Sequence, residues 1–530
     1  MSTAKISFPR STGGKLRAWN LKLISVKITN CRRPKNPFYK LKKNYLIIIL
    51  FFVVALCGAR HACAQNLEIK IKILPSSRVR IEGKLLDSTL FASNNEISFP
   101  QNYADVSALA ERIENLRLFN AKGAKIEFRK LAAGEFQAAS QPASFAYDVK
   151  IDVPENPTAA AHVSWLAANQ GILMTGDLLP ELNGARKISG KVTFEIPADW
   201  RIASGETKLD ENVFAVENLE KAVFLVGQNF REKTRRIGET NLNLAIGGAW
   251  QFSDDEAAQM AASILAEYRK MFGEIPAQRA QIILLPFERA AANPESWRAE
   301  TRGRTVTIIS GALTSKRESV QRLCEQLRHE IFHLWIPNAV NLTGNYDWFY
   351  EGFTVYEALR TGVWTNQIRF EDYLKTLAQA FDLAKNQNSS LVEMSDKRWL
   401  GKNNSVYARG MLAAFLCDLA ILNQSKGRRL LTDVFQKIYR AYHDSNSSAD
   451  GTTAILEILK SYPELNSIIQ NYIEGAAKIQ WQNQLNQFGV EASDDGETRL
   501  QVASKLDGRQ KDLLDKLGYN NWRKLLRTKK

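Results

Sequence analysis

Two of the five histidines in this chain stand four residues apart, in the segment His329-Glu-Ile-Phe-His333. Residues i and i+4 of an α-helix lie on the same face, so both imidazoles can bind one Zn²⁺. Glu330 would then face a water bound to that metal and could take its proton as a general base. The spacing therefore predicts a zinc site that hydrolyses its substrate.

The segment around these residues has the pattern of a helix. Apolar residues recur at helical spacing from position 319 to position 335, and Pro337, which cannot continue a helix, follows. The apolar stripe consists of Val320, Leu323, Cys324, Leu327, Ile331 and Leu334. We therefore expect a helix that carries both histidines near its C-terminal end.

A candidate for the third metal ligand follows 18 positions after His333. Glu351 lies in the segment Trp348-Phe-Tyr-Glu-Gly-Phe-Thr-Val-Tyr356, which is typical of a second helix. Catalytic zinc sites use three protein ligands and leave one position for water. His329, His333 and Glu351 would complete such a set, so we expect one Zn²⁺ per chain.

At these residues the chain resembles the gluzincin metallopeptidases, specifically the glycyl aminopeptidase family and, more distantly, the aminopeptidase N family. The segment EGFTVY (351–356) is close to the context in which those families place the third ligand, and HLW (333–335) matches their continuation of the zinc helix. The spacing is one residue shorter than is usual in aminopeptidase N, which the loop 338–347 could absorb. The resemblance implies a mostly helical, thermolysin-like catalytic domain and peptidase activity.

The resemblance extends to two further residues. Tyr407, in Val406-Tyr-Ala-Arg-Gly410, matches a tyrosine that stabilises the tetrahedral intermediate, with Arg409 in place of the common lysine. The alternative is a surface aromatic residue at a helix end. Glu300 is the nearest match to the carboxylate that holds the free α-amine of the substrate, although the preceding glycine of the family is missing. The alternative for Glu300 is an exposed loop carboxylate.

The pattern along the chain predicts an α+β multidomain protein. Alternating runs predict an N-terminal antiparallel β domain over 66–230, with one helix-like insert at 106–118. A mostly helical catalytic domain is expected over 240–480, with a helix after the capping box at Ser253. Residues 481–530 are expected to form a small C-terminal appendage.

The net charge of +15 is concentrated at the N-terminus. Residues 1–64 hold 13 of the 71 Lys and Arg residues and no Asp or Glu, so the remainder is nearly neutral. A neutral body does not provide the positive surface that phosphate binding needs. We therefore exclude nucleic acid as a partner, and the resemblance to the gluzincin peptidases implies a peptide or protein substrate. The sequence gives no indication of the oligomeric state.

The same N-terminal segment has the order of a secretory signal. The apolar run Tyr45–Cys57 follows lysines and precedes Ala62-Cys-Ala64, a favourable cleavage site. We expect an exported body, periplasmic or extracellular, or one anchored in the membrane by residues 45–57 if the segment is retained. Outside this segment the cysteines are Cys324 and Cys417, expected to be buried thiols rather than a disulfide.

Three functions remain open. The resemblance favours an exported zinc aminopeptidase with Glu330 as base and Tyr407 as oxyanion stabiliser. A zinc endopeptidase of the same fold, or a catalytically inactive secreted peptide-binding protein, are the alternatives. Hydrogen-bond acceptors for the zinc-binding imidazoles are expected among Asn338, Asp347 and Glu357. His162 and His443 have no partners at ligand spacing, so we expect them to be ordinary packing residues.

Overall fold

The structure is a computed structural model that describes residues 65–91, 95–182, 187–289, 296–398, 403–443, 445, 448–494 and 496–523. The predicted signal segment, residues 45–57, lies outside the described residues.

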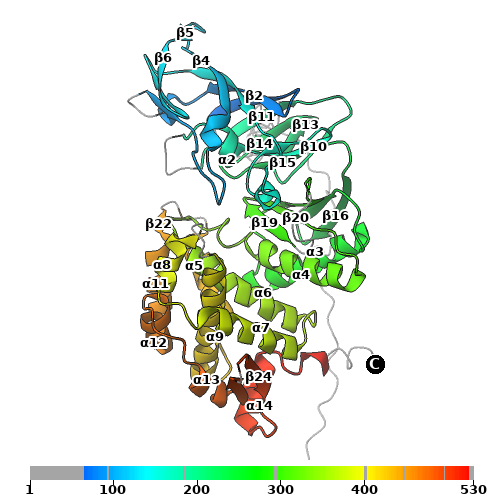
Figure 1. The fold of residues 1–530 in the computed structure, drawn as a ribbon, viewed down its shortest axis with the longest axis vertical. Helices are drawn as coiled ribbons and strands as arrows, with labels where there is room; N and C mark the ends of the chain where they lie inside the picture. Colours follow the sequence, from blue (N-terminus) through cyan, green and yellow to red (C-terminus); the bar gives the residue numbers. More distant parts are fainter. Residues whose placement is uncertain are drawn as a thin grey trace, which may run out of the picture. The chain divides into compact units, whose positions relative to one another are not determined.

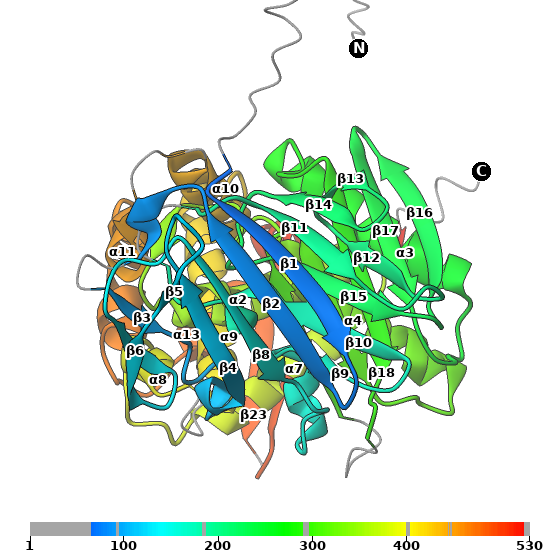
Figure 2. The same ribbon diagram turned by 90° about the horizontal axis from the view of Figure 1, so that it is seen from above.

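The largest sheet of the described chain has the strand order β13-β14-β11-β1-β2-β8-β4-β5 (Figure 2). Its strands are β1 (Leu67–Leu74), β2 (Arg78–Leu85), β4 (Ile113–Phe119), β5 (Lys125–Ile126), β8 (Ser144–Lys150), β11 (Gly190–Glu195), β13 (Thr207–Asp210) and β14 (Val213–Val216). In β1 the apolar residues Leu67, Ile69 and Ile71 are buried, and the residues between them are more exposed. This alternation gives the sheet one apolar face, which forms a core of its own.

The predicted β-rich N-terminal domain is confirmed, with one parallel pairing in its largest sheet, but the helix predicted within it is wrong. The sheet is not wholly antiparallel, because β1 pairs with β11 in parallel, from Leu67 opposite Gly190 onward. The segment 106–118 is not a helix but a short 3₁₀ turn, Leu109–Arg112, followed by β4. The pairing of β4 with β8 shifts register between Glu114 and Arg117, and Asn115 has a positive φ of 55°. This bulge breaks the alternation, which made the apolar spacing look helical.

Two smaller sheets complete the N-terminal region. One has the order β12-β15-β10-β9 and the other β3-β7-β6. Their strands are β3 (Glu96–Ser98), β6 (Phe128–Ala132), β7 (Glu135–Ala138), β9 (Trp165–Leu166), β10 (Gln170–Met174), β12 (Arg201–Ser204) and β15 (Val223–Gly227). The short helix α2 (Thr175–Leu178) follows β10 directly.

A five-stranded sheet, with the order β16-β17-β18-β20-β19, introduces the helical region. Its strands are β16 (Arg231–Ile237), β17 (Thr240–Ile246), β18 (Arg279–Pro286), β19 (Trp297–Arg302) and β20 (Thr305–Ser310). The three central strands are parallel and both edge strands are antiparallel. Helix α3 (Asp254–Phe272) crosses between β17 and β18, and it begins at Ser253 with the predicted capping box. Strand β19 forms the edge that faces the helices described next.

The helical region, which occupies the lower half of Figure 1, has one large apolar core. Its helices are α4 (Lys316–Phe332), α5 (Asp347–Tyr350), α6 (Gly352–Trp364), α7 (Phe370–Ala384), α8 (Leu391–Asp396), α9 (Asn403–Ser425), α10 (Leu431–Tyr442), α11 (Gly451–Lys460) and α12 (Asn466–Ile468). The strands β21 (Leu342–Thr343) and β22 (Ala449–Asp450) pair with each other. Cys324 and Cys417 are free and buried, as predicted.

The C-terminal residues pack against the same helical core. They form α13 (Gln482–Gln487), the hairpin β23 (Val490–Asp494) and β24 (Thr498–Val502), and α14 (Gly508–Lys516). Trp481 stacks on Phe381 of α7 with ring centroids 4.3 Å apart, and the hydroxyl of Thr498 donates to Asp382 at 2.8 Å. These contacts make the segment a continuation of the helical core.

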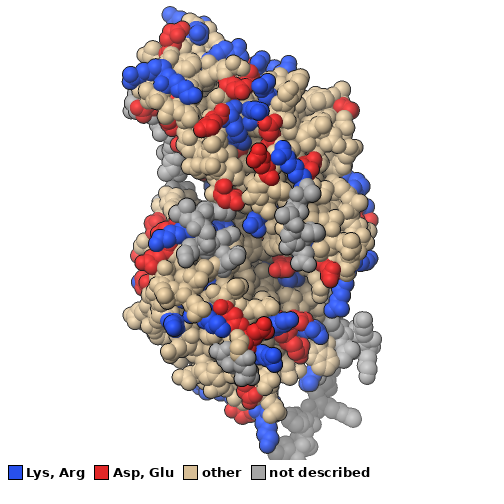
Figure 3. Space-filling view, in the orientation of Figure 1, with Lys and Arg blue, Asp and Glu red and all other residues tan. Residues whose placement is uncertain are grey.

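Only one helix among the described residues is long and apolar enough to cross a membrane. It covers Ser405–Ser425 of α9, and 83% of that window is buried inside the protein, as expected for a central core helix. On the face drawn in Figure 3, positive and negative side chains are interspersed. This mixture agrees with the nearly neutral composition of the body.

Candidate active site

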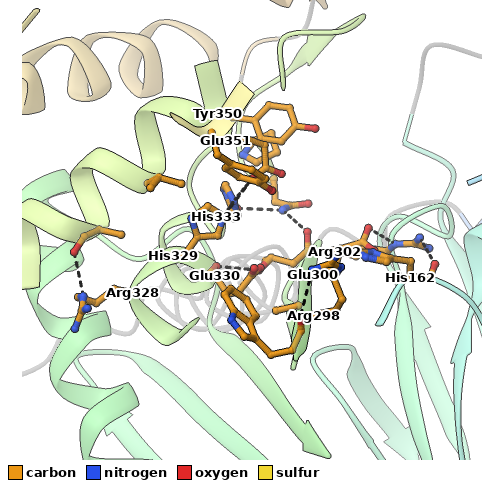
Figure 4. A pocket seen from close by; sticks show the side chains of 18 of the residues that line it. His162, Arg298, Glu300, Arg302, Arg328, His329, Glu330, His333, Tyr350 and Glu351 are labelled. Carbon is orange, nitrogen blue, oxygen red and sulfur yellow. Dashed lines mark hydrogen bonds and ion pairs between the residues drawn. The ribbon is translucent and has the colours of Figure 1, made fainter. Parts of the chain in front are cut away.

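The predicted metal ligands converge at the place where α4 ends and α6 begins (Figure 4). Nε2 of His329 lies 3.0 Å from Nε2 of His333 and 3.1 Å from Oε2 of Glu351. Nε2 of His333 lies 3.7 Å from the same carboxylate oxygen. Three potential donor atoms therefore surround one point, which we call the metal point.

This donor set fits Zn²⁺. Ligand atoms at about 2.0–2.2 Å from a tetrahedral zinc ion lie roughly 3.3–3.5 Å from one another, and the observed separations bracket that range. Two imidazoles and one carboxylate are also the donor types of catalytic zinc sites. The third ligand is contributed by the residue directly before α6, so the two helix ends hold the set together.

Glu330 lies beside the ligands and is bound by the edge strand β19. The hydroxyl of Thr301 is 2.8 Å from Oε2 of Glu330 and 2.8 Å from its backbone carbonyl. Burial raises the pKa of Glu330, and the two neighbouring histidines only partly oppose this effect. The arrangement fixes a carboxylate whose affinity for protons is increased, which is what a general base needs.

The acceptor for the imidazole of His333 is different from the residues we expected. Nδ1 of His333 lies 2.8 Å from the carbonyl oxygen of Ile336, so this nitrogen donates and Nε2 is left with its lone pair toward the metal point. Asn338 instead bonds the backbone of Thr301 and of His333. Asp347 and Glu357 pair with arginines, so none of the three predicted residues contacts an imidazole.

Arg398 connects the metal ligand to the other predicted catalytic group, and sequence reasoning missed it. Its guanidinium donates to Oε1 of Glu351 at 2.9 Å, to Asp347 at 2.8 Å and to the hydroxyl oxygen of Tyr407 at 2.9 Å. Burial opposes ionisation of Glu351, but Arg398 and the histidines outweigh it and hold the pKa of Glu351 well below its usual range. Glu351 thus turns Oε1 to the arginine and Oε2 to the metal point.

Tyr407 lies one turn into α9, with its ring centroid 6.1 Å from that of His329. Burial, followed by the negative charge of Glu351, raises the pKa of Tyr407 well above its usual value, so the phenol keeps its proton. The alternative of a surface aromatic residue is therefore wrong. Arg409 points away from the site and donates to the carbonyls of Tyr472, Gly475 and Ala477.

A close contact between two glycines sets the distance between α6 and α9. A Cβ on Gly352 would lie 2.6 Å from Cα of Gly410, and a Cβ on Gly410 would lie 2.5 Å from Cα of Gly352. Each glycine is next to a site residue, since Gly352 follows Glu351 and Gly410 comes three positions after Tyr407. The absence of both side chains lets the backbones touch, and this contact places the ligand near the tyrosine.

Glu300 lies on β19 in a network of donors rather than in an exposed loop. Nδ1 of His162 is 2.7 Å from Oε2, Nε of Arg302 donates to Oε1 at 2.8 Å, and the hydroxyl of Tyr103 also donates to Oε1. Burial alone would raise the pKa of Glu300, but Arg302 and His162 lower it to about 2. Glu300 is therefore a carboxylate with one oxygen fully bonded and the other partly free.

The expectation that His162 is an ordinary packing residue is wrong, because His162 lines the site. It comes from the N-terminal β region, as does Tyr103, whose ring lies 4.0 Å from the guanidinium of Arg302. No local pattern could reveal these residues, since 138 positions separate His162 from Glu300. His443, by contrast, bonds the carbonyl of Ala339 and stacks on Tyr439, away from the ligands.

All the predicted site residues line one cavity of about 1410 Å³. They are His329, Glu330, His333, Glu351, Tyr407 and Glu300. The cavity also receives residues from the N-terminal region and from α7. It is large enough for several residues of a peptide.

Comparisons with known proteins agree with this arrangement. Residues 99–223 match the model of the Peptidase M61 N-terminal domain. A comparison with curated proteins found no match.

Solved structures with a similar fold are described as an aminopeptidase N family protein and as an M1 zinc metallopeptidase. An aminopeptidase N family protein from Idiomarina loihiensis is 17% identical with a TM-score of 0.67, covering 84% of this chain and 82% of that one. An M1 zinc metallopeptidase from Deinococcus radiodurans, solved as a mutant bound to a Tyr-Ser-Ala substrate, is 15% identical with a TM-score of 0.54, covering 78% and 95%.

At these identities the structural likeness shows the fold, and the match to a peptidase domain adds the family relation of the N-terminal region. The chain thus carries an N-terminal domain similar to that of the M61 peptidases on the fold of the M1 zinc metallopeptidases, and its resemblance to the gluzincin peptidases is confirmed.

Proposed function

We propose that this protein is a zinc-dependent aminopeptidase with one Zn²⁺ held by His329, His333 and Glu351. The observation that carries the proposal is the convergence of these three donors beside Glu330 in one cavity. Supporting it, the chain shares its fold with zinc metallopeptidases and part of its sequence with a peptidase family.

Each residue would have a separate role in the hydrolysis of the peptide bond. A bound Zn²⁺ would acidify a water molecule and polarise the scissile carbonyl. Glu330, oriented by Thr301, accepts a proton from the attacking water and passes it to the leaving amine. The phenol of Tyr407 donates a hydrogen bond to the oxyanion that develops on the carbonyl oxygen. Arg398 keeps Tyr407 and Glu351 in position for this step.

Glu300 would hold the free α-amine of the substrate. Its carboxylate stays ionised, and Oε2 has one bonded neighbour, His162, so a lone pair is left for an ammonium group. An amine held there would restrict cleavage to the first peptide bond of the substrate.

One observation favours a second candidate function, a zinc endopeptidase. Arg302 already neutralises Glu300 at 2.8 Å, which reduces the attraction of that carboxylate for a substrate amine. A site without an amine requirement would cleave peptides with blocked N-termini as well.

The test uses the full chain loaded with zinc. We expect one bound zinc per chain, cleavage of free-amine peptides, and activity at least about 10³-fold lower in Glu330→Gln. Failure on N-acetylated peptides would assign the aminopeptidase, and equal cleavage would assign the endopeptidase. Absence of zinc, or activity indifferent to Glu330, would leave only a secreted peptide-binding protein on this fold.

We also propose that the body is exported. The apolar run Tyr45–Cys57 and the basic residues before it support this location. Fractionation of cells that express the full chain checks it. A soluble product that begins near Gln65 indicates a cleaved signal, an extractable membrane product indicates an anchor, and a product in the cytoplasm contradicts export.

A further inference from the structure

Arg328, the residue before the first metal ligand, is a buried cation without an acidic partner among the described residues. It is 4% exposed. Its Nε donates to the carbonyl of Ala358 at 3.0 Å and its Nη1 to the side-chain oxygen of Gln367 at 2.6 Å, both neutral acceptors. A buried guanidinium is normally compensated by an anion, because removing its charge from water is costly.

Other buried arginines of the chain are compensated. Arg302 pairs with Glu300, Arg360 with Glu357, and Arg398 with Glu351. Arg409 has no carboxylate, but it donates to three backbone carbonyls and does not line the cavity. Arg328 differs from all of these because it lines the cavity and has only two neutral acceptors.

The surroundings of Arg328 leave its guanidinium open on one side. Nη2 has no protein acceptor in the described part of the chain. Helix α6 makes room for the group at Gly362, where a Cβ would lie only 3.1 Å from Cζ of Arg328. One nitrogen is thus left for an acceptor brought by a ligand.

The charges around this arm of the cavity favour an anion. Arg317 and Arg369 also line it, and Asp372 is already paired with Arg369 at 2.8 Å. Glu325, one turn before Arg328 on α4, also lines the cavity, but it is exposed and forms no ion pair with Arg328, so three arginines face two carboxylates. The wall therefore keeps an excess of positive charge.

Arg328 and Glu300 lie on opposite sides of the metal ligands in Figure 4. If Glu300 holds the substrate amine, Arg328 faces the residues that follow the scissile bond. Ala358, which Arg328 contacts, comes seven residues after Glu351, about 10 Å along α6. An extended substrate chain spans these roughly 10 Å in about three residues, and a glutamate side chain of the substrate spans part of them.

We propose that Arg328 is a specificity residue that binds a substrate carboxylate on the leaving side of the scissile bond. The carboxylate is either an acidic side chain or the C-terminus of a short peptide. This inference rests on the proposed function, and it adds a substrate class, short or acidic peptides, to it.

The first test compares two pairs of peptides on the zinc-loaded full chain. Ala-Glu-Ala-amide against Ala-Gln-Ala-amide probes the side chain, and tetra-alanine as free acid against its amide probes the terminus. We expect KM to be at least about tenfold lower for the acidic member of one pair, because a charge-assisted hydrogen bond is lost in the other member. Equal KM values within both pairs overturn the proposal.

The second test replaces the guanidinium. Arg328→Gln should lose the acidic preference while zinc content and kcat for the neutral peptides change by less than about twofold. Arg298→Gln is the matched control, because Arg298 lines the same cavity on the Glu300 side, and it should keep the preference. A preference that persists in Arg328→Gln overturns the proposal. If Arg328→Gln does not fold, Arg328→Lys, which keeps the charge, should retain part of the acidic preference. Equal KM values for the acidic and neutral peptides in Arg328→Lys would then contradict the proposal.

A binding measurement separates this inference from the proposed function. Calorimetry with the zinc-loaded Glu330→Gln variant reports affinity for the same four peptides without turnover. If the variant binds the acidic peptides more tightly and the unchanged protein cleaves no peptide, the Arg328 site is supported and the peptidase is rejected. Cleavage that depends on Glu330 but shows no acid selectivity would reject the Arg328 site alone, and no binding of any peptide would reject both.

Discussion

Arg398 joins two distant parts of the chain, since one guanidinium contacts Asp347 and Glu351 on one side and Tyr407 on the other. The histidine ligands could be predicted because their geometry is local, four residues apart on one helix. Arg398 could not, because it lies 47 positions after Glu351 in no periodic pattern, and only the packing of α8 and α9 brings it back. Single polar contacts across such distances have no sequence signal.

The first prediction concerns metal retention. Arg398→Met leaves Oε1 of Glu351 without its cation, so the carboxylate can rotate away from the metal point. We expect zinc affinity to fall about 10- to 100-fold, measured by competition with a chelator. Arg398→Lys should recover part of the loss, and Arg440→Met, at an exposed arginine on α10, should have no effect. Unchanged zinc affinity in Arg398→Met would contradict the positioning role.

The second prediction concerns His162. His162→Ala removes one of three donors to Glu300, so that carboxylate loses part of its orientation. We expect KM for free-amine peptides to rise about tenfold, with zinc content and kcat unchanged. His443→Ala is the matched control, since His443 contacts Ala339, Tyr439 and Glu274 and does not line the cavity. A fall in kcat with KM unchanged would show that His162 does not act through the amine site.

At the scale of elements, the contact of α6 with α9 explains how two short motifs that lie far apart in the sequence come together in the site. Gly352 follows the third ligand and Gly410 follows Tyr407, and each fills the space that the side chain of the other would need. The sequence resemblance located both residues but not their contact, because a helix-to-helix distance depends on the packing of residues from both helices. The prediction of a helix at 106–118 is wrong for a similar reason, because a bulge in β4 gives the apolar residues a spacing like that of a helix.

The third prediction tests this contact. Gly410→Ala forces the helices apart against backbone, which a side-chain rotation cannot relieve. We expect a loss of about 1–3 kcal/mol of unfolding free energy and a larger relative loss of activity, because Tyr407 moves away from the metal point. Denaturant unfolding and kinetics measure the two effects. Gly508→Ala, at a helical glycine with no atom within 4 Å, should be close to neutral, and equal destabilisation of both variants would argue against the contact.

At the scale of the whole molecule, the active site depends on residues from both the β region and the helical region. The N-terminal region contributes His162, Tyr103 and further lining residues to the cavity, while β19 and the helices contribute the metal ligands, Glu330, Glu300 and Tyr407. The fold class could be predicted from the change in periodicity along the chain, from alternation to helical spacing. The way in which the two regions share one cavity could not, because no residue pattern records contacts between separate cores.

The fourth prediction concerns stability and pH. Glu206, between β12 and β13, is 5% exposed, and burial raises its pKa to about 7, although Arg304 opposes the shift. Because the folded protein binds this proton more tightly than the unfolded chain, the stabilisation is complete below pH 4.5 and is lost as the pH rises through 7. The loss is about 3 kcal/mol by pH 8 to 9. Glu206→Gln should remove this dependence, measured by denaturant unfolding at several pH values, and Glu211→Gln, at an exposed carboxylate, should not.

The parallel pairing of β1 with β11 has a consequence for how the chain is made. Residues 67–72 come early from the ribosome, but their partner strand begins 123 positions later. Until that length has been synthesised, β1 lacks one of its two neighbours and the sheet cannot close. A chain that has not closed this sheet is the form that a translocation channel can thread. The topology of the sheet would therefore delay folding until the proposed export has begun.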